Sequence, residues 1–257
     1  MNREEKFKFG VPLDKLCYHN NMTTTRKAFI YLNLFIFVTM LIAVISTLIF
    51  GGRATRLDAG TTAGAAQLAS GAFGGVKIEY WHHIVSFTIL SNIFLGLVAL
   101  ISATIAIRHP QKGLSTKLAT WYLVAASSTM LTCLTVLFFL APMRAISGRN
   151  YFDMLLEQMF FLHFLNPILG AICYIFFFKT ETKIGLKPCL LAILPPVIYS
   201  SPYIFCVCII KIWPDFYGLT FGGNYYVIPL VYLVFCSVML VISSSLAALH
   251  NHYQKLK

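Results

Sequence analysis

Long apolar stretches alternate with short polar segments along most of the chain. Six of these stretches reach the roughly 20 residues that a helix needs to cross the hydrocarbon core of a bilayer. None contains Lys or Arg, and none alternates with the period of two that marks a barrel strand. Because backbone groups in lipid must bond within their own segment, the pattern predicts transmembrane helices over residues 28–50, 83–107, 118–141, 154–178, 188–210 and 226–249.

The segments between the apolar stretches predict one domain. We expect an all-α, polytopic membrane protein with a six-helix transmembrane bundle over residues 28–249, an N-terminal polar segment over 1–27 and a tail over 250–257. The longest connection, residues 51–80, is rich in Ala, Gly and Thr and is interpreted either as a lid or as a passive linker.

Composition agrees with a membrane protein. Hydrophobic residues make up 58% of the chain and charged residues 11%. A soluble globular protein carries about 25% charged residues. The composition therefore excludes an ordinary soluble domain, and its high hydrophobicity excludes a disordered chain.

The net charge of +11 is unevenly distributed. Fourteen of the 20 Lys and Arg residues lie in the N-terminal segment, the second and fourth connections and the tail. The positive-inside rule therefore predicts that both termini are cytoplasmic. We expect the bilayer and anionic lipid headgroups at the cytoplasmic face as partners, and no nucleic acid, because no soluble domain carries the basic residues.

Two of the predicted spans carry polar stripes. A polar side chain within a span is costly and usually faces the bundle interior. Residues three and four apart share a helix face. The stripe on the second span consists of Thr88, Ser91, Asn92 and Gly96, and that on the fourth span of His163, Asn166, Pro167 and Gly170. Their similar depths allow the two stripes to meet.

This combination of side chains suggests a chemistry and a simpler alternative. A hydroxyl such as that of Thr88 becomes a nucleophile when a neutral imidazole such as that of His163 takes its proton. Asn92, Asn166 and Ser91 are then candidates for substrate or oxyanion binding. Alternatively, Thr88 bonds back to a helix carbonyl and His163 is a packing group. Ser128, Thr132 and Thr135 on the third span are interpreted as contacts between helices.

Prolines and cysteines add two expectations. Pro195, Pro196 and Pro202 should break the fifth span, which is tolerated where the break is buried or lines a cavity. The 7 cysteines form no Cys-x-x-Cys pattern, and most lie within spans as small apolar residues. The sequence thus predicts no metal site and no cofactor.

The two polar motifs resemble a known family. Phe87-Thr-Ile-Leu-Ser-Asn92 and His163-Phe-Leu-Asn-Pro167 are similar to the two marks of the family of the androgen-induced protein and the androgen-dependent TFPI-regulating protein, with its bacterial six-pass relatives. The resemblance covers six spans, with Thr on the second and His on the fourth. It implies an intramembrane threonine hydrolase of fatty-acid esters of hydroxy fatty acids, with Thr88 and His163 as the catalytic pair. The N-terminal segment and the 51–80 connection depart from the animal members, and the surroundings of His163 are closer to the bacterial branch.

The sequence therefore predicts a multi-pass membrane hydrolase of lipid-like esters, located in the cell membrane if the chain is bacterial. Two other functions stay open. The broken fifth span and the polar stripes also suit a transporter or channel for a small or lipid-like solute. A non-catalytic membrane scaffold is the third hypothesis, which separation of Thr88 from His163 would favour. The sequence makes no prediction of the oligomeric state.

Overall fold

A computed structural model describes residues 22–58, 86–146, 148, 150–180, 182–210 and 225–255. Within these residues the structure is helical, and an isolated bridge between Leu114 and Thr180 is the β-type pairing found. Six helical segments of the described chain are long and apolar enough to cross a membrane. They are Thr24–Ile49, Phe87–Arg108, Thr116–Met143, Gln158–Phe177, Leu186–Ile209 and Ile228–Gln254. The predicted all-α fold with six spans is confirmed, and no span end differs from its predicted position by more than five residues.

Two boundaries differ for local reasons. Helix α1 (Thr24–Asp58) continues past its apolar part, so the predicted connection 51–80 begins with helix. Arg, Ala and Leu in that stretch are good helix formers. The rest of that connection, residues 59–80, lies outside the described part of the chain. The fourth span begins at Gln158 rather than at residue 154, because Glu157 has a positive φ of 53° and separates the 3₁₀ helix η4 (Tyr151–Leu155) from α7 (Gln158–Phe160).

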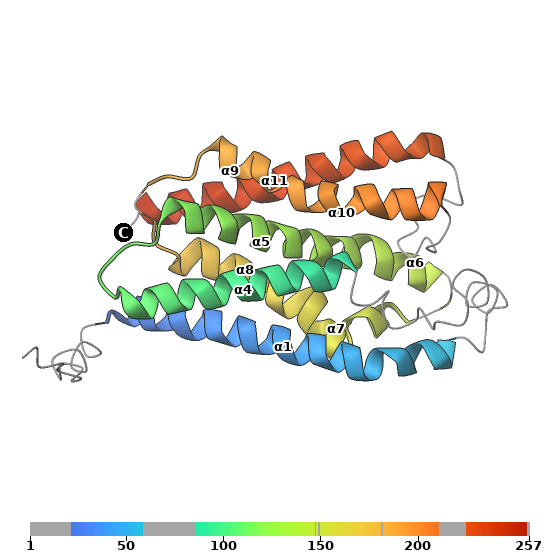
Figure 1. The fold of residues 1–257 in the computed structure, drawn as a ribbon, viewed down its shortest axis with the longest axis horizontal. Helices are drawn as coiled ribbons and strands as arrows, with labels where there is room; N and C mark the ends of the chain where they lie inside the picture. The colour runs from blue at the N-terminus through green and yellow to red at the C-terminus, as the bar shows by residue number, and fades with distance from the viewer. Residues whose placement is uncertain are drawn as a thin grey trace, which may run out of the picture.

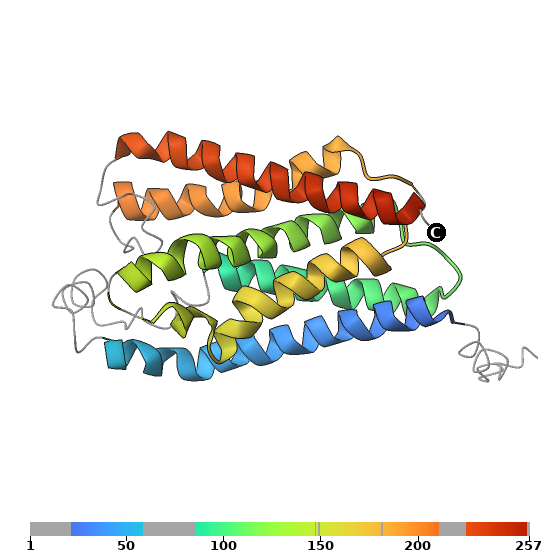
Figure 2. The same ribbon diagram turned by 180° about the vertical axis from the view of Figure 1, so that it is seen from behind.

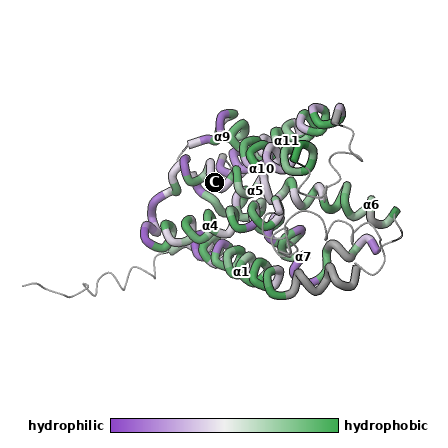
Figure 3. The backbone as a smooth tube through the Cα atoms, turned by 45° about the vertical axis from the view of Figure 1, so that its right-hand side comes forward, coloured by the Kyte–Doolittle hydropathy of each residue, from purple (hydrophilic) through white to green (hydrophobic). Residues whose placement is uncertain are grey.

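The long helices lie side by side, and α5 (Thr116–Thr135) is central. In Figures 1 and 2, α10 (Leu194–Ile204) and α11 (Ile228–Lys255) lie on one side of α5, and α1 lies on the other. Helix α4 (Phe87–Arg108) packs against both α1 and α5. The helices are apolar along most of their length, and in Figure 3 hydrophilic residues gather most visibly near the end that carries the C-terminus.

Several spans contain a π-helical turn. These turns are η3 (Val136–Leu140), η5 (Phe161–Leu165), η6 (Cys173–Phe177) and η7 (Phe205–Ile209). In the fifth span, α9 (Leu186–Leu191) ends before Ala192, and α10 begins with Pro195 and Pro196 in its first turn. Proline lacks the N–H that a continuing helix needs. The predicted break in this span is therefore confirmed.

One end of the bundle is densely packed. We call it the terminal end, because α1 begins there and α11 ends there, and we call the opposite end the distal end. Tyr122 stacks on Tyr174 with ring centroids 6.0 Å apart, and Tyr174 stacks on His250 at 4.7 Å. Phe178 packs edge-on against Phe29, and all five rings are buried. This aromatic cluster fills the space between α1, α5, η6 and α11.

The end of α11 holds the 178–184 segment in place at the terminal end. Asn251 accepts a bond from the backbone N–H of Ile184 at 3.0 Å and donates to its carbonyl at 2.8 Å. His250 donates through Nδ1 to the Tyr174 carbonyl at 2.9 Å. The neighbouring connection joins this segment, because the N–H of Leu114 donates to the Lys179 carbonyl at 2.9 Å.

Candidate functional site

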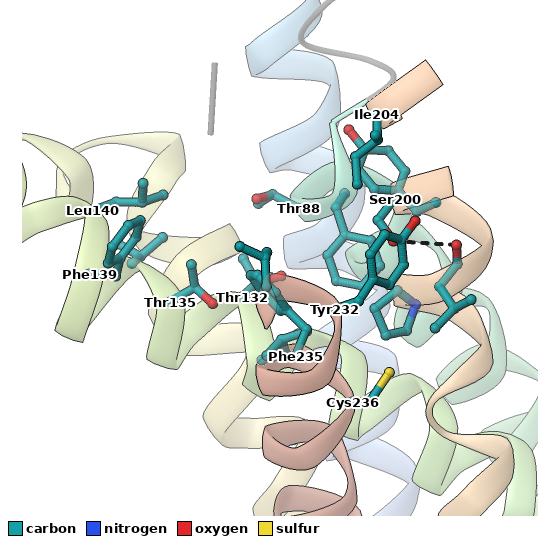
Figure 4. A pocket seen from close by; sticks show the side chains of 17 residues that line it. Thr88, Thr132, Thr135, Phe139, Leu140, Ser200, Ile204, Tyr232, Phe235 and Cys236 are labelled. Carbon is teal, nitrogen blue, oxygen red and sulfur yellow. Dashed lines mark hydrogen bonds between the residues drawn. The ribbon is translucent and has the colours of Figure 1, made fainter. Parts of the chain in front are cut away.

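A cavity of about 80 Å³ lies in the distal half of the bundle, between α4, α5 with η3, α10 and α11. Figure 4 shows it at close range. Among the described residues, no Lys, Arg, Asp, Glu or His belongs to its wall. The wall residues are Phe87, Thr88, Leu131, Thr132, Thr135, Val136, Phe139, Leu140, Pro196, Val197, Tyr199, Ser200, Ile204, Val231, Tyr232, Phe235 and Cys236. The cavity is thus an uncharged, mostly apolar space with a few hydroxyl groups.

The hydroxyl groups come from three sides of this cavity. In Figure 4, Thr88 lies between the α5–η3 side, which carries Thr135, and the side formed by Ser200 and Tyr232. Thr132 donates to the Ser128 carbonyl at 3.4 Å, as Thr in a membrane helix commonly does. Within the described residues, the Thr88 and Thr135 hydroxyls have no hydrogen-bond partner. They are therefore available to a molecule in the cavity.

The position of Thr88 at the start of its helix explains its free hydroxyl. Helix α4 begins at Phe87, and Ser86 caps it by accepting a bond from the N–H of Ile89 at 3.4 Å. Thr88 is the second helical residue, so the carbonyl to which a mid-helix Thr would bond back lies before the helix begins. Within the described residues no back-bond from the Thr88 hydroxyl to a helix carbonyl is found. By contrast, Thr104 farther along α4 donates to the Leu100 carbonyl at 2.8 Å.

Asn92 links the second span to the fourth through a backbone carbonyl that a proline leaves without a donor. In η5 the N–H of Asn166 bonds to the carbonyl of Phe161, five residues back. The matching donor for the Leu162 carbonyl would be residue 167, which is proline and has no N–H. Asn92 Nδ2 supplies this bond at 2.9 Å, and it also donates to the Thr88 carbonyl at 2.8 Å. Its amide therefore joins α4 to η5.

This arrangement leaves no N–H of Asn92 for an oxyanion. The side-chain amide has two N–H groups, and both are committed to backbone carbonyls. In this arrangement the Asn92 amide serves to connect α4 with η5, and its predicted oxyanion role finds no free donor. Ser91 is committed in a similar way, since its hydroxyl donates to the Thr88 carbonyl at 3.1 Å and lies 3.5 Å from the Thr132 hydroxyl.

Asn166 lies deeper in the bundle and contacts α1. Its Oδ1 is 2.7 Å from the Thr39 hydroxyl, and its Nδ2 is buried without a hydrogen-bond partner among the described residues. Asn166 is fully buried and is not part of the cavity wall. It therefore connects α8 (Asn166–Ile172) to α1 rather than facing the cavity.

His163 is buried and is not among the described residues that line the cavity. It is 6% exposed and sits in η5, next to the Leu162 carbonyl that Asn92 binds. No hydrogen bond joins Thr88 to His163. The structure therefore brings the backbone segments of Thr88 and His163 together, and it places Thr88, but not His163, among the residues that line the cavity.

Sequence reasoning missed several wall residues. Thr135 was interpreted as a helix contact, and Ser200 and Tyr232 were not singled out. The spacing of Thr132 and Thr135, which puts both on one face, was the available signal. Within the described residues no group of three or more His, Cys, Asp and Glu side chains could hold a metal ion.

Comparison with known protein families, curated proteins and solved structures gave no match for this chain. The resemblance to the androgen-induced protein family thus remains a prediction from the two motifs. The fold itself identifies a multi-pass membrane protein with a cavity between its helices.

Proposed function

We propose that this protein is an intramembrane hydrolase of lipid-like esters, with Thr88 as the nucleophile. One observation carries the proposal: a Thr hydroxyl without a hydrogen-bond partner faces an apolar, uncharged cavity. Such a cavity suits an ester that partitions into the bilayer, because no described residue of its wall carries a charge that would compensate a charged substrate.

In the proposed reaction, Thr88 Oγ1 forms a bond to the ester carbonyl carbon and gives up its proton to His163. The carbon–oxygen bond to the leaving alcohol then breaks, and the alcohol takes that proton. Water hydrolyses the acyl-threonine, releases the carboxylic acid and restores Thr88. Because His163 is not among the residues that line the cavity, the proposed proton transfer runs through one water molecule, a route open to a general base.

The partners of Thr88 in this proposal differ from those that the sequence suggests. Thr135 has a hydroxyl without a partner in the same cavity and is the proposed oxyanion donor. Asn92 acts through position, since it holds the Thr88 turn against the segment that carries His163. Its effect on the rate is therefore indirect.

Hydrolysis is favoured over transport by the terminal end of the bundle. A transporter or channel needs a path to both sides, whereas the buried rings of Tyr122, Tyr174 and Phe178 fill the half of the bundle beyond the cavity. A non-catalytic scaffold gives no reason for a Thr88 hydroxyl that lines the cavity and has no hydrogen-bond partner among the described residues.

We further propose that the terminal end is cytoplasmic and faces anionic headgroups. The exposed basic residues of its connections support this orientation; they are Arg108, Lys112, Lys117, Lys179, Lys183 and Lys187. Cysteine accessibility tests it: a thiol introduced at Ser115 should react with an impermeant reagent only after cells are opened. Labelling of intact cells would overturn the orientation.

Labelling with a fluorophosphonate that carries an alkyl chain tests the hydrolase proposal. The protein in liposomes should be labelled, and Thr88→Val should abolish the label. Removing the base in His163→Ala should slow labelling by about 10²–10⁴-fold. Thr104→Val is the matched control, because Thr104 lies on the same helix with its hydroxyl bonded back. Label that survives in both Thr88→Val and His163→Ala would contradict the proposal.

A further inference from the structure

The two helices on one side of the cavity are the least buried spans of the described chain. In the most apolar part of each span, 17% of residues are buried for Leu186–Ile209 and 22% for Ile228–Gln254. The corresponding values for the other described spans run from 39% to 61%. Since an apolar span is exposed to lipid where protein does not cover it, α10 and α11 face the bilayer.

The cavity lies directly behind this lipid-facing side. Helix α5 with η3 supplies its buried floor, including Leu131, Thr132 and Val136. Helices α10 and α11 supply opposite parts of its wall, from Pro196 to Ile204 and from Val231 to Cys236. A molecule leaving the bilayer between α10 and α11 would therefore reach the cavity without crossing the packed core.

One exposed hydrogen bond joins α10 to α11 at this point. The Tyr232 hydroxyl lies 3.2 Å from the Ser201 hydroxyl, and this contact is exposed. Tyr232 is also a wall residue of the cavity, whereas Ser201 is not. Pro202 follows Ser201 inside α10 and removes a backbone donor from that helix. The link between the two helices is thus weak and sits in front of the cavity.

We propose that Tyr232 and Ser201 form a lateral gate, through which an uncharged single-chain lipid passes from the bilayer into the cavity. The proposal rests on the proposed function, because it concerns the same cavity and names the class of molecule that enters it. When the hydrogen bond breaks, the Tyr232 side chain is free to swing away from α10. The ester group and the first carbons of the acyl chain then lie in the cavity beside Thr88 and Thr135, and the rest of the chain extends between α10 and α11 into the bilayer.

Photolabelling tests the gate without any need for catalysis. The probe is a long-chain fatty alcohol with a diazirine in its chain, added to the full-length protein in phosphatidylcholine liposomes. Labelled peptides should come from α5, α10 and α11. Ser201→Ala should raise the initial labelling rate several-fold and leave the final extent unchanged, because Ser201 is outside the wall. Tyr232→Phe should raise the rate similarly.

The matched control is Ser237→Ala. Ser237 is an exposed serine on α11 whose hydroxyl donates to the Leu233 carbonyl, so its removal should leave the rate unchanged. An unlabelled long-chain methyl ester should compete with the probe, and lysophosphatidylcholine should not, because its headgroup is charged. The gate is overturned if Ser201→Ala behaves like Ser237→Ala, if only one of the two gate variants changes the rate, or if lysophosphatidylcholine competes equally.

The gate and the hydrolase can fail separately. Thr88→Val should lose fluorophosphonate labelling and keep diazirine labelling, since the cavity remains. Persistent fluorophosphonate labelling of Thr88→Val, together with faster diazirine labelling of Ser201→Ala, would overturn the hydrolase proposal and support the gate proposal. If Thr88→Val loses fluorophosphonate labelling and Ser201→Ala leaves the rate of diazirine labelling unchanged, the hydrolase proposal is supported and the gate proposal is overturned.

Discussion

The terminal and distal halves of this bundle are both built from mostly apolar helices, but the terminal half is densely packed and the distal half contains a cavity. At the terminal end, Tyr174 and His250 are fully buried, and α11 bonds to the neighbouring segment through side chains. In the distal half, the same helices leave a cavity with hydroxyl groups in its wall. The contrast indicates that one end fixes the arrangement of the helices and the other end is free to hold a ligand.

The difference can be traced to where polar side chains find partners. Asn251 bonds to both the N–H and the carbonyl of Ile184, so these polar groups at the terminal end find their hydrogen-bond partners within the protein. Thr88 and Thr135 point their hydroxyls into the cavity without a partner among the described residues. Since a polar group in an apolar environment is costly when unpaired, the distal hydroxyls are where a ligand gains most.

The largest expected effect on the free energy of unfolding comes from a substitution at the terminal end. Tyr174→Ala removes a fully buried ring from the aromatic cluster and should lower the free energy of unfolding by about 3–5 kcal/mol. Phe139→Ala removes a half-buried ring beside the cavity and should cost less than half as much. Thermal unfolding in detergent measures both. Equal losses would show that the two halves do not differ in packing.

A substitution at Asn92 tests the hydrogen bond that joins α4 to η5. Asn92→Leu leaves the Leu162 carbonyl unpaired and should cost about 1–3 kcal/mol. It should also slow fluorophosphonate labelling, because the Thr88 turn loses its support. Ser102→Ala is the control on the same helix, since the buried Ser102 hydroxyl has no partner among the described residues. If the two variants are equally mild, Asn92 has no positioning role.

At the terminal end, Asn251→Ala removes two hydrogen bonds to Ile184 and should cost about 1–2 kcal/mol locally. The Ile184 amide should then exchange with solvent deuterium about tenfold faster, as measured by hydrogen-exchange mass spectrometry. His252→Ala changes an exposed neighbour and should leave the exchange unaltered. Unchanged exchange in Asn251→Ala would mean that α11 does not hold this segment.

The smallest expected effect is at Thr88. Thr88→Val removes a hydroxyl without a partner and should change the free energy of unfolding by less than about 0.5 kcal/mol. Thr39→Val removes the hydroxyl that lies 2.7 Å from Asn166 Oδ1 and should cost about 1 kcal/mol or more. Thermal unfolding of the two variants provides the comparison. A large loss in Thr88→Val would assign its hydroxyl to structure rather than to a ligand.

The spans themselves could be predicted from the sequence, because lipid requires every backbone group to bond within its helix. The same argument located the break in the fifth span at Pro195 and Pro196. The proximity of the second and fourth spans was also foreseeable in outline from their polar residues at similar depth, and Asn92 on one span bonds to the Leu162 carbonyl on the other.

The details of the site could not be predicted, because hydropathy does not specify which helices are neighbours. The partner of Asn92 depends on a π-helical turn at residues 161–165 and on the missing N–H of Pro167, which only the three-dimensional arrangement reveals. Likewise, Tyr232 enters the cavity wall because α11 packs beside α10, although the two stripes considered in the sequence lie on other spans.

The most direct test of the central claim is to trap an acylated Thr88. The protein in liposomes would be incubated with a long-chain fatty-acid ester, quenched in acid, digested and analysed by mass spectrometry. The account predicts an acyl group on Thr88 that disappears in Thr88→Val and on longer incubation without substrate. An acyl group on another residue, or hydrolysis at an unchanged rate in Thr88→Val, would contradict it.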